Sequence, residues 1–366
     1  MSFFKAPFSP SSIFLSPNYG SKAVKINGGE NVLFFGGGCN KFRDSVVIYN
    51  FAKNSYQKFS LNKENFNNFD YTDDFVEENS FCGLAAMDMV YVEKDNTVLI
   101  YGGITGENGF SDTLYVLENY ADLKIIQTTG DRPSARIGHT FTKINDNEIV
   151  LIGGVENVSR TRYKIIPKYL NDIYILHINE SSYRWERIDA QNFEEPCPRE
   201  SHSTIFFENQ NQLIVYGGMN GIKRINDVWI LNLHSLKWTK VNTSGAIARS
   251  MHTATLIDDK MYVFGGFTHD RYNSKEWKCT NNIQYLDLQS LKWRNISVTI
   301  RPLSRAGHVA IEYHGRLYIW SGRVGSNFDE THPIKCHDDV WYFESKNPLK
   351  VTNVEIRNIE KESFRV

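Results

Sequence analysis

The sequence repeats one feature six times: an apolar run that ends on a pair of glycines. The runs are FFGGG at 34–38, LIYGG at 99–103, VLIGG at 150–154, IVYGG at 214–218, YVFGG at 262–266 and, with serine in place of the first glycine, YIWSG at 318–322. Successive pairs are spaced by roughly 48 to 65 residues, which indicates repeated units that share strands and differ in their loops. This recurrence constrains the fold more than any other feature of the chain.

Each unit is expected to supply four strands. In the fourth unit they fall in RESHSTIFF, QLIVYGG, DVWILNL and KWTKV. Gly217 and Gly218 end the second strand, where the missing Cβ allows a positive φ and a close approach of neighbouring strands. The same structural role is predicted for Gly102, Gly103, Gly153, Gly154, Gly265 and Gly266. Alanine at these positions should therefore cost stability.

Large aromatic residues are predicted to pack one sheet on the next. Trp229 and Trp341 lie in third strands, and Trp238 and Trp293 in fourth strands. Six small sheets that bury both faces against their neighbours close into a ring, so the sequence predicts an all-β, six-bladed β-propeller.

We expect this domain to occupy residues 1–346, with a tail at 347–366. Residues 1–20 are expected to supply the outermost strand of the sixth blade, in preference to 350–356, because the amino terminus leads directly into the first inner strand.

The charge balance and the cysteines exclude several classes of function. Lys plus Arg (41) nearly equals Asp plus Glu (42), which argues against nucleic-acid or membrane binding driven by net charge. No stretch approaches the roughly 20 apolar residues of a membrane span. Five cysteines without zinc-ligand spacing indicate a reducing compartment and no disulfide framework. We expect a monomeric propeller without cofactor, metal, membrane or direct nucleic-acid partner.

The glycine pairs, the Asp-aromatic motif and the spaced tryptophans resemble kelch repeats. Longer segments narrow the resemblance to the kelch domain of the host cell factor family. They are PKYLNDIYIL at 167–176, PCPRESHST at 196–204, LIVYGGMNG at 213–221, DKMYVFGG at 259–266, KEWKCTNN at 275–282 and GRLYIWSGRVG at 315–325. The resemblance covers roughly residues 18–345, and the tail is similar to the opening of the fibronectin type III segment that follows the propeller in that family.

The resemblance implies a non-enzymatic module of a transcriptional coregulator. In that family the propeller docks short acidic peptides, Asp or Glu followed by His, any residue and Tyr, which transcription factors carry. The family also tethers chromatin-modifying complexes, including histone methyltransferases. The resemblance therefore implies a nuclear location, with the cytoplasm as second choice, since no basic localisation run is visible.

Two departures from the repeat pattern affect the expected ligand. Arg-x-x-His is replaced by Asn18 and Ser21 in the first blade, and by the region around Cys82 and Gly83 in the second. The segment 60–80 is longer and more acidic than the resemblance predicts. It is either an internal mimic of an acidic ligand or a disordered loop.

The loops between each glycine pair and the following Asp motif are expected on one face of the disc. They carry thirteen basic and six acidic residues, which favours an acidic partner. Four lead-in loops carry Arg-x-x-His, whose histidine should pack between blades while the arginine reaches either carbonyls or a bound carboxylate. The candidate peptide-binding residues are Arg136, Arg199, Glu200, Ser201, Asn220, Lys223, Arg224, Arg249, Ser250, Arg271, Arg305 and Arg323. Glu200 is the predicted acceptor for a peptide histidine.

Two alternatives remain open at this level. A propeller enzyme would need a site such as the cluster His332, Cys336, His337, Asp338 and Asp339, although the two aspartates occupy the repeat motif. A cytoplasmic kelch scaffold for cytoskeletal or trafficking partners would share the fold and differ only in ligand and compartment.

Overall fold

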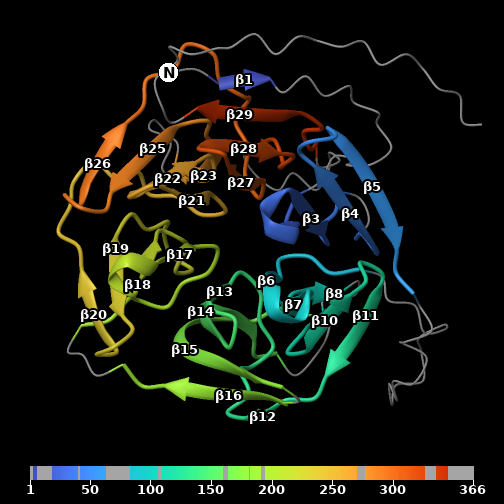
Figure 1. Ribbon diagram of the computed structural model, residues 1–366. Coiled ribbons are helices and arrows are strands. Elements are labelled where there is room, and N and C mark those ends of the chain that lie inside the picture. Colours follow the sequence, from blue (N-terminus) through green and yellow to red (C-terminus); the bar gives the residue numbers. More distant parts are fainter. Residues whose placement is uncertain are drawn as a thin grey trace, which may run out of the picture.

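The structure, a computed structural model, confirms the all-β, six-bladed propeller. Six sheets of four or five strands, antiparallel except for one short strand in blade 3, stand around one axis (Figure 1). The described residues are 3–5, 19–39, 42–62, 83–105, 109–159, 164–180, 182–190, 194–269, 277–325 and 335–344. In these ranges the helices are three single 3₁₀ turns, η1 (Asn27–Gly29), η3 (Glu93–Asp95) and η4 (Glu208–Gln210). Among the described residues, no helix has the length and apolar character to span a membrane.

The blades follow one another along the chain. Blade 1 contains β2 (Lys22–Ile26), β3 (Asn31–Phe35), β4 (Ser45–Asn50) and β5 (Ser55–Ser60), and blade 2 contains β6 (Asp88–Val92), β7 (Thr97–Tyr101), β10 (Leu114–Glu118) and β11 (Asp122–Ile126). Blade 3 contains β13 (Thr140–Asn145), β14 (Glu148–Asn157), β15 (Pro167–Asn179) and β16 (Ser182–Ile188), with β12 (Thr129–Gly130) parallel to β16. Blade 4 contains β17 (Ser203–Phe207), β18 (Gln212–Tyr216), β19 (Val228–Asn232) and β20 (Lys237–Lys240).

The last two blades keep the same order. Blade 5 contains β21 (Thr253–Ile257), β22 (Lys260–Phe264), β25 (Ile283–Asp287) and β26 (Lys292–Asn295), and blade 6 contains β27 (Val309–Tyr313), β28 (Arg316–Trp320), β29 (Val340–Glu344) and β1 (Phe3–Lys5). Two short hairpins stand apart from the blades: β8 (Ile104–Thr105) with β9 (Gly109–Phe110), and β23 (Phe267–His269) with β24 (Trp277–Cys279).

An amino-terminal strand closes the ring. β1 pairs antiparallel with β29 and is the outermost strand of blade 6, so this blade is built from both ends of the described chain (Figure 1). Phe3 is 1% exposed, and its ring lies 5.4 Å from that of Phe264 in blade 5 and 5.2 Å from that of Phe343. The strand therefore joins blades 5 and 6 as well as completing blade 6.

Each pair of neighbouring blades encloses its own apolar cluster. Between blades 4 and 5, for example, Tyr216 packs on Trp293 with ring centroids 4.7 Å apart. Trp229 and Trp238 are buried between blades 3 and 4, whereas Trp341 is partly buried between blades 5 and 6. The core of the molecule is thus a circle of six interfaces, in which both faces of every sheet are covered.

The glycine pairs have a positive φ and no room for a side chain. Gly217 and Gly218 have φ of 68° and 99°. A Cβ on Gly217 would lie 2.8 Å from the carbonyl oxygen of Arg249, and one on Gly218 would lie 2.7 Å from that of Glu200. The second glycine of each pair is thus required where a strand end meets the neighbouring backbone.

Candidate functional site

Six residues, one from each blade, form a closed ring of backbone hydrogen bonds around the axis. They are Gly20, Ala86, Gly138, Ser201, Met251 and Gly307, each two residues before a first strand, and we call them the axial ring. Each N–H donates to the carbonyl of its counterpart in the preceding blade over 2.7–3.1 Å, and Gly20 of blade 1 donates to Gly307 of blade 6. All six have a positive φ between 52° and 71°. Three of the six are not glycine, and a positive φ costs each of these about 1 kcal/mol. The hydrogen bonds of the ring hold the backbone in this conformation.

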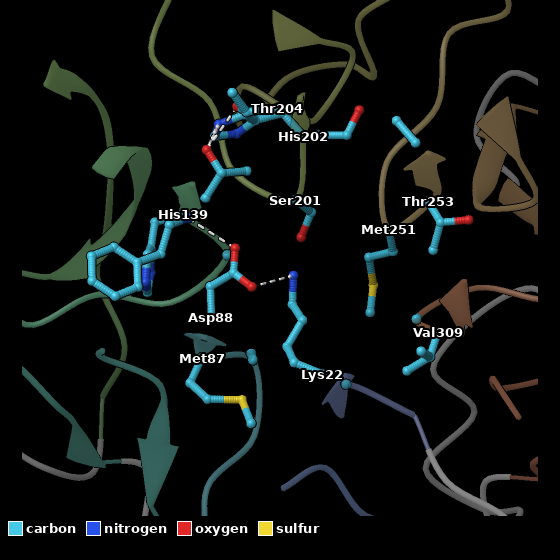
Figure 2. A pocket seen from close by; sticks show the side chains of 18 of the residues that line it. Lys22, Met87, Asp88, His139, Ser201, His202, Thr204, Met251, Thr253 and Val309 are labelled. Carbon is cyan, nitrogen blue, oxygen red and sulfur yellow. Dashed lines mark hydrogen bonds and ion pairs between the residues drawn. The ribbon is translucent and has the colours of Figure 1, made fainter. Parts of the chain in front are cut away.

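A cavity of about 400 Å³ lies along the axis, lined by the axial ring and the first strands of all six blades. Lys22 of blade 1 extends into it, with Nζ 3.1 Å from Oδ1 of Asp88 in the neighbouring blade 2 (Figure 2). The other carboxylate oxygen of Asp88 accepts a hydrogen bond from the N–H of Phe141 in blade 3 at 2.9 Å. An ion pair and its hydrogen bond therefore join the first three blades at the centre of the molecule.

The arginines of the Arg-x-x-His loops are buried inside their own blades. Arg199 is 1% exposed; its Nη1 donates to Oδ1 of Asp227 at 2.6 Å and its Nη2 to Oδ2 at 3.1 Å. Arg136 with Asp172 and Arg305 with Asp339 repeat this bidentate pair. Arg249 donates instead to the side-chain oxygens of Asn282 and Gln284. The prediction that Arg136, Arg199, Arg249 and Arg305 contact a ligand is therefore wrong, because their guanidinium groups lie inside the blades and bind side chains in or just before the third strand.

The histidines of the same loops join neighbouring blades, as predicted. Nε2 of His202 lies 3.3 Å from the hydroxyl of Thr140 in blade 3, and Nε2 of His252 lies 2.9 Å from that of Ser203 in blade 4. Burial, and secondarily the Arg199 charge, lowers the pKa of His202 to about 3. Burial also lowers the pKa of His252 well below its ordinary value. These imidazole rings are therefore neutral and connect neighbouring blades, and they are not ligand-binding groups.

Blades 1 and 2, which lack Arg-x-x-His, use other groups at the same places. Leu84 and Met87 occupy the arginine and histidine positions of blade 2, close to Gly36 of the first glycine pair. Lys22 and Asp88 occupy the positions that carry Thr140 or Ser203 in later blades, each the first residue of the first strand. Blades 1 and 2 are thus joined by the Lys22–Asp88 ion pair, where later blades use a histidine and a hydroxyl. The sequence analysis did not predict this ion pair.

Two arginines stack on one aromatic ring beside the axial ring. The Arg224 guanidinium carbon lies 5.6 Å from the ring centre of Phe267, and that of Arg323 lies 5.3 Å from the same ring. Arg323 also lies 5.4 Å from the ring of Tyr19, and Arg224 donates to the hydroxyl of Ser250 at 3.1 Å. The two side chains are 8% and 3% exposed. Blades 4, 5, 6 and 1 therefore concentrate positive charge at one side of the axis, in a setting of low dielectric.

Glu200 stands next to this arginine pair. Burial raises the pKa of Glu200, while the hydroxyl of Ser201, which donates to its carboxylate at 2.8 Å, and the charge of Arg224 oppose the rise. Burial, with a contribution from the Glu200 charge, raises the pKa of Tyr169. In its ionised form, which Ser201 and Arg224 favour, the Glu200 carboxylate is an acceptor for a ligand N–H.

The opposite side of the axial ring is apolar. In blades 2 and 3 the positions equivalent to Glu200 and Ser250 are Ala85 and Ile137, and backbone bridges pair them with Ile104 and Val155. The residues that flank the axial ring are therefore cationic and aromatic in blades 4 to 6 and aliphatic in blades 2 and 3.

Comparison with known proteins identifies the family. The model of the host cell factor kelch-repeat domain matches residues 5–344. The chain belongs to the host cell factor family. It is 33% identical to host cell factor of Drosophila melanogaster over 93% of this chain, 34% identical to human host cell factor 1 over 96%, and 31% identical to human host cell factor 2 over 95%. It spans 23%, 17% and 44% of the lengths of these relatives.

This host cell factor domain brings part of the predicted site together. Glu200, Ser201, Arg224, Ser250 and Arg323 gather beside the axial ring. Asn220 and Lys223 lie farther out in a tight turn, where the Asn220 side chain accepts hydrogen bonds from the N–H groups of residues 222 and 223. Arg271 and residues 63–80 of the acidic segment 60–80 fall outside the described residues.

Sequence reasoning missed Tyr19, Phe267 and Ile137 as members of the site. A signal was present, because each lies at a fixed place in its repeat: Tyr19 and Ile137 just before the axial ring, and Phe267 just after a glycine pair.

The predicted ligand cluster of the enzyme alternative is dispersed in this host cell factor domain. Asp339 pairs with Arg305, His337 contacts the carbonyl of Ser304, and Cys336 lies beside Cys39. His332 is outside the described residues. Within the part of the chain that the structure describes, no group of three or more metal-ligating side chains occurs.

Proposed function

We propose that this host cell factor domain is a protein-docking module that binds a short, extended acidic peptide over the axial ring and catalyses no reaction. The observation that carries the proposal is the contrast between the residues that flank the axial ring: Arg224 and Arg323 around Phe267 in blades 4 to 6, and Ile104 and Ile137 in blades 2 and 3. A peptide with an acidic residue and an aromatic residue close together matches both sides at once.

In this proposal, the residues that flank the axial ring each contact one part of the peptide. Arg224 and Arg323 supply the positive potential for the peptide's Asp or Glu, and Glu200 accepts a hydrogen bond from the peptide's histidine. The aliphatic side formed with Ile137 buries part of the tyrosine ring. The peptide pattern that fits is Asp or Glu, His, any residue, Tyr. A four-residue contact buries little area, so we expect micromolar affinity, about −8 kcal/mol.

The proposed partners follow from the family. We place the protein in the nucleus, where it docks transcription factors that carry such peptides and tethers chromatin-modifying complexes, including histone methyltransferases. Pull-down from nuclear extract with the domain, compared with an Arg323→Gln variant, tests this assignment. Recovery of cytoskeletal or trafficking proteins alone, with equal yield from both baits, would instead support the cytoplasmic scaffold.

Titration of labelled peptides tests the docking site directly. Fluorescence anisotropy should give saturable micromolar binding of an Asp-His-x-Tyr peptide, and at least about tenfold weaker binding when Tyr becomes Ala or Asp becomes Asn. Arg224→Gln and Arg323→Gln should each weaken binding by a similar factor.

Arg294→Gln is the matched control, because Arg294 is exposed on the outermost strand β26, away from the axis. This variant should bind as the unaltered protein does. Thermal unfolding of every variant separates loss of the site from loss of the fold. Absence of saturation, or equal affinity for the Tyr and Ala peptides, would overturn the proposal.

A further inference from the structure

Two cysteines meet where the propeller closes on itself. Cys39 follows β3 of blade 1 and Cys336 precedes β29 of blade 6; they are 297 residues apart in sequence, yet their Sγ atoms are 3.0 Å apart. Both are partly exposed and neither is in a disulfide. We propose that Cys39 and Cys336 form a reversible disulfide by exchange with glutathione disulfide, and that this bond locks blade 1 to blade 6.

Backbone pairing on both sides holds the two thiols together. Gly38, next to Cys39, exchanges hydrogen bonds with Tyr19 at 3.1 and 3.2 Å. On the other side, Cys336 bridges to Arg323 and is flanked by the bonds Val324 N–H to the carbonyl of residue 335 and His337 N–H to that of residue 322, both 2.8 Å. Tyr19 and Arg323 in turn stack on each other. A shift of about 1 Å brings the sulfurs to bonding distance, about 2.05 Å.

The other described cysteines have no thiol beside them. Cys197 accepts a hydrogen bond from Arg199, and buried Cys279 contacts the carbonyl of Arg323. Burial raises the pKa of Cys279 to about 12, which keeps it a protonated, unreactive thiol. Among the described residues, the geometry therefore selects one pair.

The exchange balances in two steps. The Cys39 thiolate attacks one sulfur of glutathione disulfide, and one glutathione leaves as its thiolate, which takes up the proton that Cys39 lost. The Cys336 thiolate then attacks Sγ of Cys39 and releases the second glutathione with the proton of Cys336. The two cysteine thiols are oxidised to one disulfide, and glutathione disulfide is reduced to two molecules of glutathione.

The order of attack follows from the environment of Cys336. Burial, and then the neighbouring Cys39, raises the pKa of Cys336, so this thiol is the poorer first nucleophile. The contribution of Cys39 to that rise ends once Cys39 is in the mixed disulfide. Cys336 is then positioned to resolve it, as a second cysteine does in thiol-based redox sensors.

The position of the pair makes the bond a lock on the whole ring. The blade 1–blade 6 seam is otherwise held by contacts such as the Lys25–Glu312 ion pair at 2.8 Å and the Gly20–Gly307 hydrogen bond. A crosslink between residues 297 apart in sequence encloses most of the chain, and long enclosed loops restrict the unfolded state most. Oxidation should therefore raise the unfolding temperature, and reduction should reverse the change.

Redox-buffered unfolding of the full chain tests the proposal. The protein is equilibrated in buffers of reduced and oxidised glutathione, alkylated, digested and analysed by mass spectrometry, with thermal unfolding measured in parallel. We expect a linked Cys39–Cys336 peptide pair and an increase in unfolding temperature of about 5–10 °C on oxidation. Dithiothreitol should remove both.

Cys39→Ser and Cys336→Ser should fold like the unaltered protein under reducing conditions and lose the oxidation-dependent shift. Cys197→Ser, which changes a cysteine outside the pair, should keep both the linked peptide and the shift. Failure to find the linked pair, or stable glutathionylation of Cys39 or Cys336 in its place, would refute the disulfide. A linked pair that leaves the unfolding temperature within 1–2 °C would refute the lock.

Discussion

The arginine of the Arg-x-x-His motif has a structural role in this propeller, because its buried charge is hydrogen-bonded inside the blade. Arg199 is enclosed with Asp227, whereas Arg249 of blade 5 donates to neutral oxygens: the carbonyl of Gly265 and the side chains of Asn282 and Gln284. Burial accordingly lowers the pKa of Arg249. The repeat tolerates loss of the carboxylate while both Nη groups of Arg249 keep acceptors, although its Nε is buried without a hydrogen-bond partner among the described residues.

The buried histidines should make stability depend on pH. His202 has a folded-state pKa of about 3, below its ordinary value near 6.5, so only the unfolded chain binds a proton between these values. Its contribution is fully present above about pH 6.5 and is lost as pH falls toward 3. Urea unfolding between pH 4.5 and 7.5 should show the free energy of unfolding of His202→Asn falling less steeply with acid, by about 1.4 kcal/mol per pH unit at most.

The exposed residue His234 provides the comparison for this experiment. His234→Asn should follow the pH profile of the unaltered protein. Identical slopes for His202→Asn and the unaltered protein would mean that His202 does not remain neutral in the fold.

At the scale of the element, the three-residue strand β1 should contribute far more stability than its length indicates. Phe3 is buried against Phe264 and Phe343, so Phe3→Ala should lower the free energy of unfolding by about 3–5 kcal/mol, because it opens a cavity between blades 5 and 6. Urea denaturation measures the change. Phe4→Ala on the same strand is the matched control, since Phe4 is 38% exposed and should cost less than about 1.5 kcal/mol. Equal losses from the two variants would show that β1 does not pack as a closing strand.

The strands were readable from sequence because their signals are local. The glycine pair requires a positive φ at a strand end, and the apolar run before it requires burial, so QLIVYGG already predicts β18 (Gln212–Tyr216). The axial ring could not be predicted from the sequence. Ala86, Ser201 and Met251 adopt a positive φ, and their residue types do not indicate that conformation. The sequence repeats the Arg-x-x-His motif and the Asp-aromatic motif together, which is consistent with the Arg199–Asp227 pair. An arginine is equally typical of a ligand site, so the sequence alone did not separate the two roles.

For the whole molecule, charge distribution matters more than net charge. The chain carries a formal charge of −1, yet Arg224 and Arg323 are almost buried beside the axis while Lys223 lies exposed in the turn. Exposed charges steer association and are screened by salt, whereas buried charges are screened much less. If the acidic residue of a bound peptide is held by the arginine pair, salt should act mainly on association.

Stopped-flow measurements with an Asp-His-x-Tyr peptide separate the two rates. Raising the salt concentration from about 0.05 to 0.5 M should slow association several-fold and change the dissociation rate by less than about twofold. Lys223→Gln should reduce the salt dependence of association with little effect on dissociation, because this residue acts before contact. Arg323→Gln should speed dissociation at every salt concentration. A dissociation rate that rises in step with salt would mean that exposed lysines, and not the arginines stacked on Phe267, hold the acidic residue.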